Sequence, residues 1–236
     1  EMRLEFIQNV LERLRQAPDT RIISVSQNDN GAYCTCPECS RVNAEEGSES
    51  GNIIRFVNEV ATEVRKEFPS TIVETLAYQY SKQPPRLARP AGNVMIRLCG
   101  DAMDFSVPVT HPKNAEFASF VKQWAEISQH LGIWYYAANY ANSSIPHPNW
   151  QNWGEDFRFF RDHKVIYVLV EADHFGNEHP ELGELRAFLL RNLLWDPSRS
   201  EDALTDEFLQ LYYGPAANAV SQYLAIHDFH VVKADS

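Results

Sequence analysis

Short apolar runs rich in β-branched and aromatic residues recur along this chain, and segments with helical periodicity separate most of them. One run, Val165–Val170, is apolar on both faces, as is typical of a parallel strand that helices cover. Strands that alternate with helices favour an α/β fold built on a parallel sheet. The runs lie at about residues 21–27, 71–79, 93–99, 132–138 and 164–171.

The segments between the runs predict helices that pack on a sheet. Apolar residues recur at spacings of three and four in residues 50–68 and 114–131, and the same pattern in residues 3–16 predicts a helix before the first strand. The link between Gln79 and Asn93 is too short and too rich in proline for a crossover helix. We therefore expect an irregular loop at that point.

The two ends of the chain differ. Helical patterns at 180–195, 200–213 and 215–229 predict a helical region over residues 179–236. At the other end, a helix leads directly into a buried strand, which indicates that the given chain is part of a longer polypeptide. We therefore expect further strands of the same polypeptide upstream.

The charge balance excludes one class of partner. The chain of 236 residues has 32 acidic and 21 basic residues, a net charge of −11, and no cluster of Lys and Arg. Binding to a phosphate backbone needs such a cluster, so we expect no nucleic acid partner. No apolar run approaches the roughly 20 residues that span a bilayer, so we also expect no membrane span.

A polar turn follows the first apolar run at once. It offers one carboxylate and three amides where a buried strand ends, and functional polar side chains in a barrel occupy this position. The alternative is a turn that merely ends the strand, because Asn, Asp and Gly dominate ordinary turns. The turn consists of Gln27, Asn28, Asp29 and Asn30, followed by Gly31.

A cysteine cluster comes directly after this turn. Cys34, Cys36 and Cys39 place three thiols within six residues, a spacing that matches a structural zinc site with a fourth ligand from Cys99 or a histidine. A disulfide, which an exported enzyme would favour, and reduced thiols are the alternatives. In each case we expect the cluster to fix the loop that carries Asp29.

Several longer motifs carry a family resemblance over nearly the whole chain. They are SQNDNGAYCTCPEC at 26–39, FVNEVA at 56–61, LAYQY at 76–80, NVMIRLC at 93–99 and LLWDPS with DEFLQLYYGPAA across 193–217. The chain resembles a bacterial family labelled a domain of unknown function, found behind α-glucuronidase-like N-terminal domains in polysaccharide-degrading bacteria. The characterised branch of that family consists of endo-β-N-acetylglucosaminidases.

The resemblance implies a (β/α)8 TIM-barrel glycoside hydrolase that is secreted, periplasmic or on the cell surface. Residues 1–178 would form about strands 4–8 of the barrel, with the helical region 179–236 packed on them. The upstream part of the polypeptide would complete the barrel, the substrate would be a carbohydrate, and no cofactor would be required.

Active sites of such barrels lie at the carboxyl ends of the strands, so the resemblance also implies site residues. Asp29 and Glu171 are the expected catalytic pair. Sugars bind to flat aromatic faces and to amide or charged groups, and side chains of these kinds follow most strands. The expected substrate-binding residues are Gln27, Asn28, Tyr78, Tyr80, Arg97, Tyr136, Asn139, Trp153 and His174.

Glycoside hydrolysis usually requires two carboxyl groups. In enzymes that use the acetamido group of the substrate as nucleophile, one carboxylate only orients that group, which suits Asp29, while Glu171 acts as acid. The reverse assignment and a structural ion pair at Glu171 are the alternatives.

One position departs from the family pattern. Tyr135 stands where the family has an acidic residue in the strand. This departure supports a competing hypothesis, a non-catalytic carbohydrate-binding barrel or a scaffold fragment of a larger enzyme. A polysaccharide that contains uronic acid is the alternative substrate.

Overall fold

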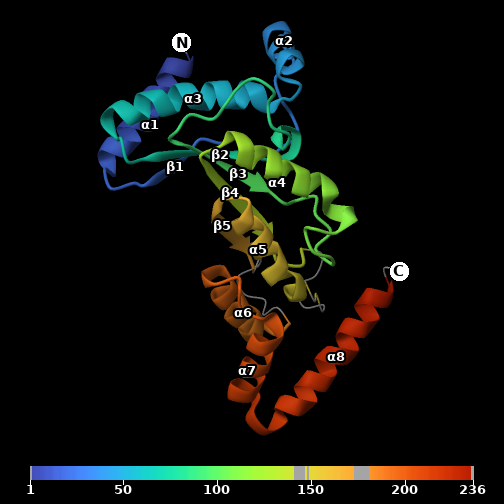
Figure 1. The fold of residues 1–236 in the computed structure, drawn as a ribbon. Helices are drawn as coiled ribbons and strands as arrows, with labels where there is room; N and C mark the ends of the chain where they lie inside the picture. Colours follow the sequence, from blue (N-terminus) through green and yellow to red (C-terminus); the bar gives the residue numbers. More distant parts are fainter. Residues whose placement is uncertain (1, 141–146, 148, 173–180, 235–236) are drawn as a thin grey trace. The chain divides into compact units, whose positions relative to one another are not determined.

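The computed structural model describes residues 2–140, 147, 149–172 and 181–234, with the backbone alone for 227–234. A five-stranded sheet carries the strands in chain order. It is parallel and curls like half of a barrel (Figure 1), so the predicted α/β class is confirmed. The strands are β1 (Ile22–Ser24), β2 (Ile72–Ala77), β3 (Val94–Cys99), β4 (His130–Tyr136) and β5 (Val165–Glu171).

The chain forms two compact units, which are described one at a time. The predicted division between residues 178 and 179 stays a prediction. The first unit comprises Glu1–Asp101, Ser119–Trp134 and His163–Leu169, and the second Ala102–Ala118, Tyr135–Asp162 and Val170–Ser236.

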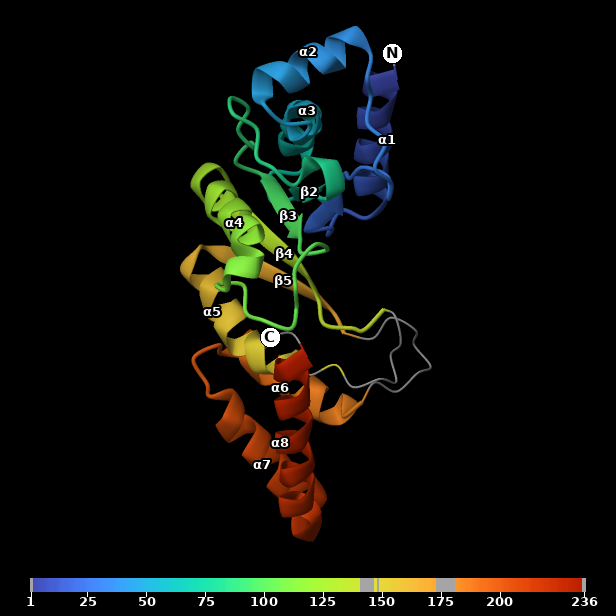
Figure 2. The ribbon, with the colours of Figure 1, turned by 90° about the vertical axis from the view of Figure 1, so that its right-hand side faces the viewer.

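Helix α3 (Ser50–Glu67) organises the first unit. It contacts α1 (Met2–Gln16), α2 (Pro37–Glu46) and strand β2 (Figure 2). Valines recur at helical spacing along α3 and form its buried apolar face. The strand residues in the same core are mainly β-branched. The core includes Leu14, Val57, Val60, Val64, Val73, Val94 and Ile96.

The second unit is mainly helical. Helix α6 (Gly183–Trp195) contacts α5 (Trp153–Asp162) and α7 (Glu201–Tyr213), and α7 forms a hairpin with α8 (Ala217–Ala234), as Figure 1 shows. The chain turns between α7 and α8 at Gly214, whose φ of 51° suits a residue without a side chain. Tyr135, Trp153, Phe160, Leu185 and Leu189 are fully buried in this unit.

The predicted helices at 3–16, 50–68, 114–131 and in the C-terminal region are confirmed, the third as α4 (Ala115–Ile127). The link after β2 is irregular apart from a short 3₁₀ turn. Helices α2 and α5 were not predicted.

The expectation that helices cover both faces of Val165–Val170 is wrong. Ile166 is 63% exposed and Tyr167 37%. The physical reason is that β5 ends the strand order of the sheet, so one of its sides has no neighbouring strand among the described residues. In the part of the chain that the structure describes, no helix combines the length and apolar character needed to cross a membrane.

Candidate functional site

Gln27 ties the turn after β1 to the turn after β2. The N–H of Val25 first extends the strand pairing by donating to the Glu74 carbonyl (2.8 Å). The Gln27 amide then donates to the Tyr78 carbonyl (2.9 Å) and accepts from the Ser81 hydroxyl (2.8 Å). The amide predicted to bind substrate therefore holds two turns together.

The Asp29 carboxylate is exposed, as is Asn28 beside it, and contacts from the next turn hold it. Tyr78 Oη donates to Asp29 Oδ1 at 3.0 Å, and Gln79 Nε2 lies 3.4 Å from the same oxygen. The contact with Gln79 lowers the pKa of Tyr78, but burial and the Asp29 carboxylate raise this pKa, and the net direction is upward. Gln79 has a φ of 48°, an uncommon left-handed conformation of a kind that clusters at functional sites.

Tyr33 and Tyr80 form an aromatic wall beside this carboxylate turn. Their ring centroids lie 5.2 Å apart at an interplanar angle of 47°. Both line a cavity of about 260 Å³, to which Asn43, Glu49 and Asn52 contribute polar groups. Burial raises the pKa of Tyr80, so its hydroxyl is a proton donor at neutral pH. Aromatic faces next to amides and carboxylates can bind the ring and the hydroxyl groups of a sugar.

Arg97 lies within β3 rather than at its end, opposite Gly132 of β4. It forms an ion pair with Glu74 on β2, and its guanidinium lies over the rings of Trp134 (5.7 Å) and Tyr167 (4.9 Å). Burial raises the pKa of Glu74 and the Arg97 charge opposes this rise, with a net upward shift. The charge predicted to bind a substrate is therefore engaged by the protein itself.

Glu171 ends β5 in the second unit. Its carbonyl accepts from the N–H groups of Ala137 and Ala138, both at 3.0 Å, and its carboxylate is hydrogen-bonded to Tyr140. Burial and this carboxylate raise the pKa of Tyr140. Because Asp29 belongs to the first unit and Glu171 to the second, their joint action stays a prediction.

The remaining predicted residues of the second unit differ in their surroundings. Tyr136 and Asn139 are half-buried, and the Tyr136 ring lies 5.8 Å from that of Tyr140. Trp153 is fully buried, and the Arg186 guanidinium lies 5.1 Å from its ring. A ring in this position offers no open face to a sugar. His174 lies outside the described residues.

The three cysteines lie together at the start of α2. The Sγ atoms of Cys34, Cys36 and Cys39 are all within 4.8 Å of one another, and all three are free thiols. The backbone N–H of Cys39 and the neighbouring thiols lower the pKa of Cys36, as is usual at a helix N-terminus. This group can hold a metal ion. Cys99, one of the two candidates for a fourth ligand beside a histidine, is buried at the end of β3 and does not belong to the group.

A buried carboxyl group in the second unit was not predicted from the sequence. Asp156 Oδ2 accepts from Tyr135 Oη, and Oδ1 accepts from the Val109 N–H, each at 2.6 Å. Burial raises the pKa of Asp156 to about 7, although both hydrogen bonds lower it. The available signal was the spacing of Trp153, Asp156 and Phe160, which places Asp156 on the buried face of a helix.

A buried guanidinium was missed as well. Arg186 donates to the carbonyls of Ala137 and His147 (2.8 Å for His147) and to Asn149 Oδ1 (3.0 Å). Burial lowers the pKa of Arg186 to about 10. An Arg among the leucines of a predicted helix was the only signal in the sequence.

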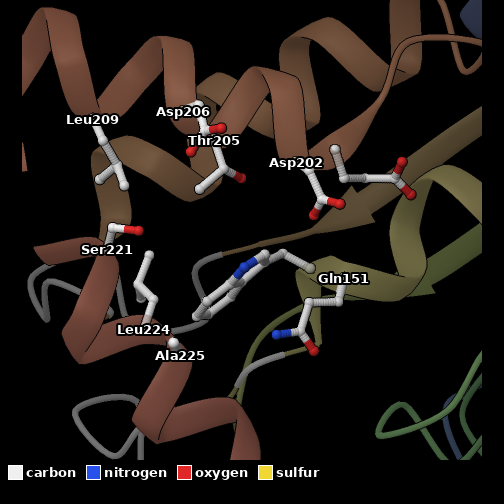
Figure 3. Close-up of a pocket in the computed structure, with 10 residues that line it drawn as sticks. Gln151, Asp202, Thr205, Asp206, Leu209, Ser221, Leu224 and Ala225 are labelled. Carbon is white, nitrogen blue, oxygen red and sulfur yellow. The ribbon is translucent and has the colours of Figure 1, made fainter. Parts of the chain in front are cut away.

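A further cavity of about 310 Å³ in the second unit is lined by α7, α8 and the short 3₁₀ turn Trp150–Asn152. Figure 3 shows Gln151 and Asp202 on one side and Ser221, Leu224 and Ala225 on the other, with Thr205 and Asp206 between Asp202 and Leu209. The lining of the cavity therefore includes both carboxylates and apolar side chains.

Comparison with known proteins places the chain in a family. No curated protein and no solved structure matches it. Residues 1–225 match a family described as a domain of unknown function (DUF4838). The match covers the strands, the cysteine cluster and most of the C-terminal helices, so the chain belongs to the DUF4838 domain-of-unknown-function family.

Proposed function

We propose that this chain is part of a glycoside hydrolase that acts on N-acetylglucosamine-containing glycans in the manner of an endo-β-N-acetylglucosaminidase. The supporting observation is the Asp29 carboxylate, which Tyr78 and Gln79 hold after the ends of β1 and β2. The aromatic wall of Tyr33 and Tyr80 lies in the same part of the first unit. Enzymes built on β/α barrels bind their substrates at this end of the strands.

The proposed enzyme is larger than the chain described here. The curled sheet supplies about strands 4–8 of a (β/α)8 TIM barrel, and the upstream part of the polypeptide, with its α-glucuronidase-like domain, completes the enzyme. The protein works outside the cytoplasm, as a secreted, periplasmic or cell-surface enzyme, because its glycan substrates occur there. The partly exposed residues of β5 are compatible with a further neighbouring strand.

Asp29 and Glu171 have separate roles in the proposed reaction. Glu171 gives its proton to the glycosidic oxygen as the bond from that oxygen to C1 breaks, while the acetamido oxygen of the substrate attacks C1. Asp29 accepts a hydrogen bond from the acetamido N–H, and Tyr78 orients the carboxylate by donating to Oδ1. Water then attacks C1 and returns a proton to Glu171. No cofactor takes part.

A non-catalytic carbohydrate-binding barrel is the second candidate function. The observation that favours it is Tyr135, which is fully buried and hydrogen-bonded to Asp156 at a position where the family pattern has an acid. A binding protein would keep the aromatic wall and would release no sugar.

Glycan release by the natural full-length polypeptide tests the proposal. The substrates are a panel of N-glycoproteins and of oligosaccharides that contain uronic acid, and the variants are Asp29→Asn and Glu171→Gln. Each substitution is expected to lower kcat/KM about a thousandfold, because each removes a group that acts in the transition state. Binding of the glycans is expected to persist.

Two matched controls sit at the opposite ends of the same strands. Asp19→Asn precedes β1 and Asp162→Asn precedes β5, and both side chains are exposed. Neither control is expected to change release more than about twofold, because surface changes of this kind have small effects. Binding by the unaltered polypeptide and by every variant, without release from any substrate by any of them, would overturn the hydrolase proposal and support the binding function. Release only from uronic-acid oligosaccharides would correct the substrate class.

A further inference from the structure

The cysteine loop is built so that three thiols converge. Cys36 precedes the first residue of α2, Pro37, and Cys39 lies one helical turn further on. The Ser40 N–H donates to the Cys36 carbonyl (2.9 Å), and the Ser40 hydroxyl donates to the Thr35 carbonyl (3.2 Å). These contacts hold the loop against the helix start, so the thiols are preorganised before any ligand arrives.

The spacing of the sulfur atoms suits one metal ion. All three Sγ atoms lie within 4.8 Å of one another. A zinc–sulfur bond of about 2.3 Å in a tetrahedral site separates the sulfurs by about 3.8 Å, so side-chain movements of about 1 Å close the site. A disulfide would use two of the thiols and leave the third, whereas one metal ion uses all of them.

Thiolate ligands select the kind of ion. Soft sulfur donors favour zinc and similar thiophilic ions over magnesium or calcium, which prefer oxygen. Two of the cysteines, Cys34 and Cys36, are exposed, so an ion can reach them from solvent. We infer that Cys34, Cys36 and Cys39 bind one thiophilic divalent ion of the zinc class, with the fourth coordination position open.

The cavity beside the thiols supplies room for the fourth ligand. Cys34 and Cys39 both line the cavity of about 260 Å³ whose wall contains Tyr33 and Tyr80. Within the described residues no further His, Cys, Asp or Glu joins the group of three. Water or an external ligand therefore takes the fourth position. The site is also linked to the core of the unit, because Asn52 of α3 donates to the Cys39 carbonyl (3.0 Å).

Cobalt titration tests this site without relying on enzymatic activity. Reduced, chelator-treated full-length protein is titrated with Co²⁺, whose bonds to thiolates produce a strong near-ultraviolet absorption. We expect saturation at one ion per chain, with displacement by Zn²⁺. Cys34→Ser, Cys36→Ser and Cys39→Ser should each weaken binding by at least about 100-fold, because each removes a direct ligand. Cys99→Ser, a control at a buried thiol outside the cluster, should leave binding unchanged.

Two further measurements keep the inference testable if a variant misfolds. Zn²⁺ should protect the three cluster thiols of the unaltered protein from alkylation without changing the labelling of Cys99. Addition of imidazole should shift the visible cobalt bands, because it enters the open position. An unshifted spectrum would overturn the open position. Absence of thiolate absorption from the reduced protein, or a native mass lower by two hydrogens at these cysteines, would overturn the metal site.

Discussion

The two units bury charged groups in different ways. In the first unit, Arg97 and Glu74 form an ion pair across adjacent strands, and the guanidinium also lies over the rings of Trp134 and Tyr167. Both side chains are largely removed from water. Each charge is thus balanced by its direct neighbour, and the pair is stable only while both members are present.

In the second unit, neutral groups supply the hydrogen bonds to Asp156 and most of those to Arg186, which also lies near the Glu181 charge. The pKa of Asp156 is raised to about 7, because its neutral hydrogen-bond partners compensate burial less well than an opposite charge would. Burial lowers the pKa of Arg186 to about 10, although the Glu181 charge opposes this shift. Loss of a charged partner is therefore expected to destabilise the first unit, whereas a change of pH is expected to destabilise the second. The neutral partners are Tyr135 and Val109 for Asp156, and Ala137, His147 and Asn149 for Arg186.

The largest expected effect comes from breaking the ion pair. Arg97→Met leaves the Glu74 carboxylate buried without its cation and removes the contact with two rings. We expect the free energy of unfolding to fall by about 5 kcal/mol, the upper end of the range for a broken buried pair. Guanidinium chloride unfolding at pH 7, followed by circular dichroism, measures the change.

The double variant Glu74→Met with Arg97→Met separates charge from packing. Because neither charge remains, we expect it to regain most of the lost stability. If the double variant were as unstable as Arg97→Met, the ring contacts rather than the ion pair would dominate the first unit.

The next largest effect is the pH dependence of the second unit. The folded-state pKa of Asp156 is raised to about 7 from 3.8, so the native state holds a proton that the unfolded chain releases. Stability therefore falls as the pH rises through this window and levels off above it, by about 4 kcal/mol in total at 1.36 kcal/mol per pKa unit. Asp156→Asn removes this term, so its stability relative to the unaltered protein should rise between about pH 4 and pH 7.

Thermal unfolding from pH 4 to pH 8 checks this prediction. Asp162→Asn is the matched control, because Asp162 lies on the same helix but is exposed, and its curve should run parallel to that of the unaltered protein. A difference between Asp156→Asn and the unaltered protein that stayed constant with pH would contradict the raised pKa.

The sheet was predictable because its strands are continuous β-branched runs, and α3 because valines recur on one face. Helix α5 was missed because Trp153 was interpreted as a substrate-binding residue, although Trp153, Phe157 and Phe160 recur at helical spacing and are buried. Helix α2 is mostly polar, so only the caps could have shown it, Pro37 at its start and Gly47 after its end.

The candidate site was predictable in part. The contact from Tyr78 to Asp29 joins two strand ends that the alternating pattern placed side by side. Sequence reasoning could not show that Arg97 is engaged by Glu74, because that contact depends on strand register. Nor could it show Asp156 beside Tyr135, which requires a helix to pack on β4.

A smaller effect is expected from Arg186→Lys. The substitution keeps the charge but replaces the planar fork, so the three oxygens that Arg186 serves cannot all be satisfied and the contacts with the Trp150 and Trp153 rings are lost. We expect a loss of about 2 kcal/mol in urea unfolding. Arg158→Lys, at a partly exposed guanidinium on α5, should change stability by less than about 0.5 kcal/mol. Equal losses in the two variants would mean that the geometry of Arg186 is unimportant.

A buried hydroxyl group tests whether the first unit also requires hydrogen-bond partners for its neutral groups, and the change in stability should be small. The Thr75 hydroxyl on β2 is buried and has no hydrogen-bond partner among the residues described. Thr75→Val keeps the branched shape and removes that hydroxyl, so we expect a gain in stability below about 1 kcal/mol, whereas Thr75→Ala should lose about 1 kcal/mol through a small cavity. Urea unfolding of the two variants at pH 7 decides between these signs. A loss in Thr75→Val would mean that the hydroxyl is satisfied, by water for example. A gain would show that the first unit tolerates an unsatisfied buried hydroxyl group, whose burial costs far less than that of an unpaired charge.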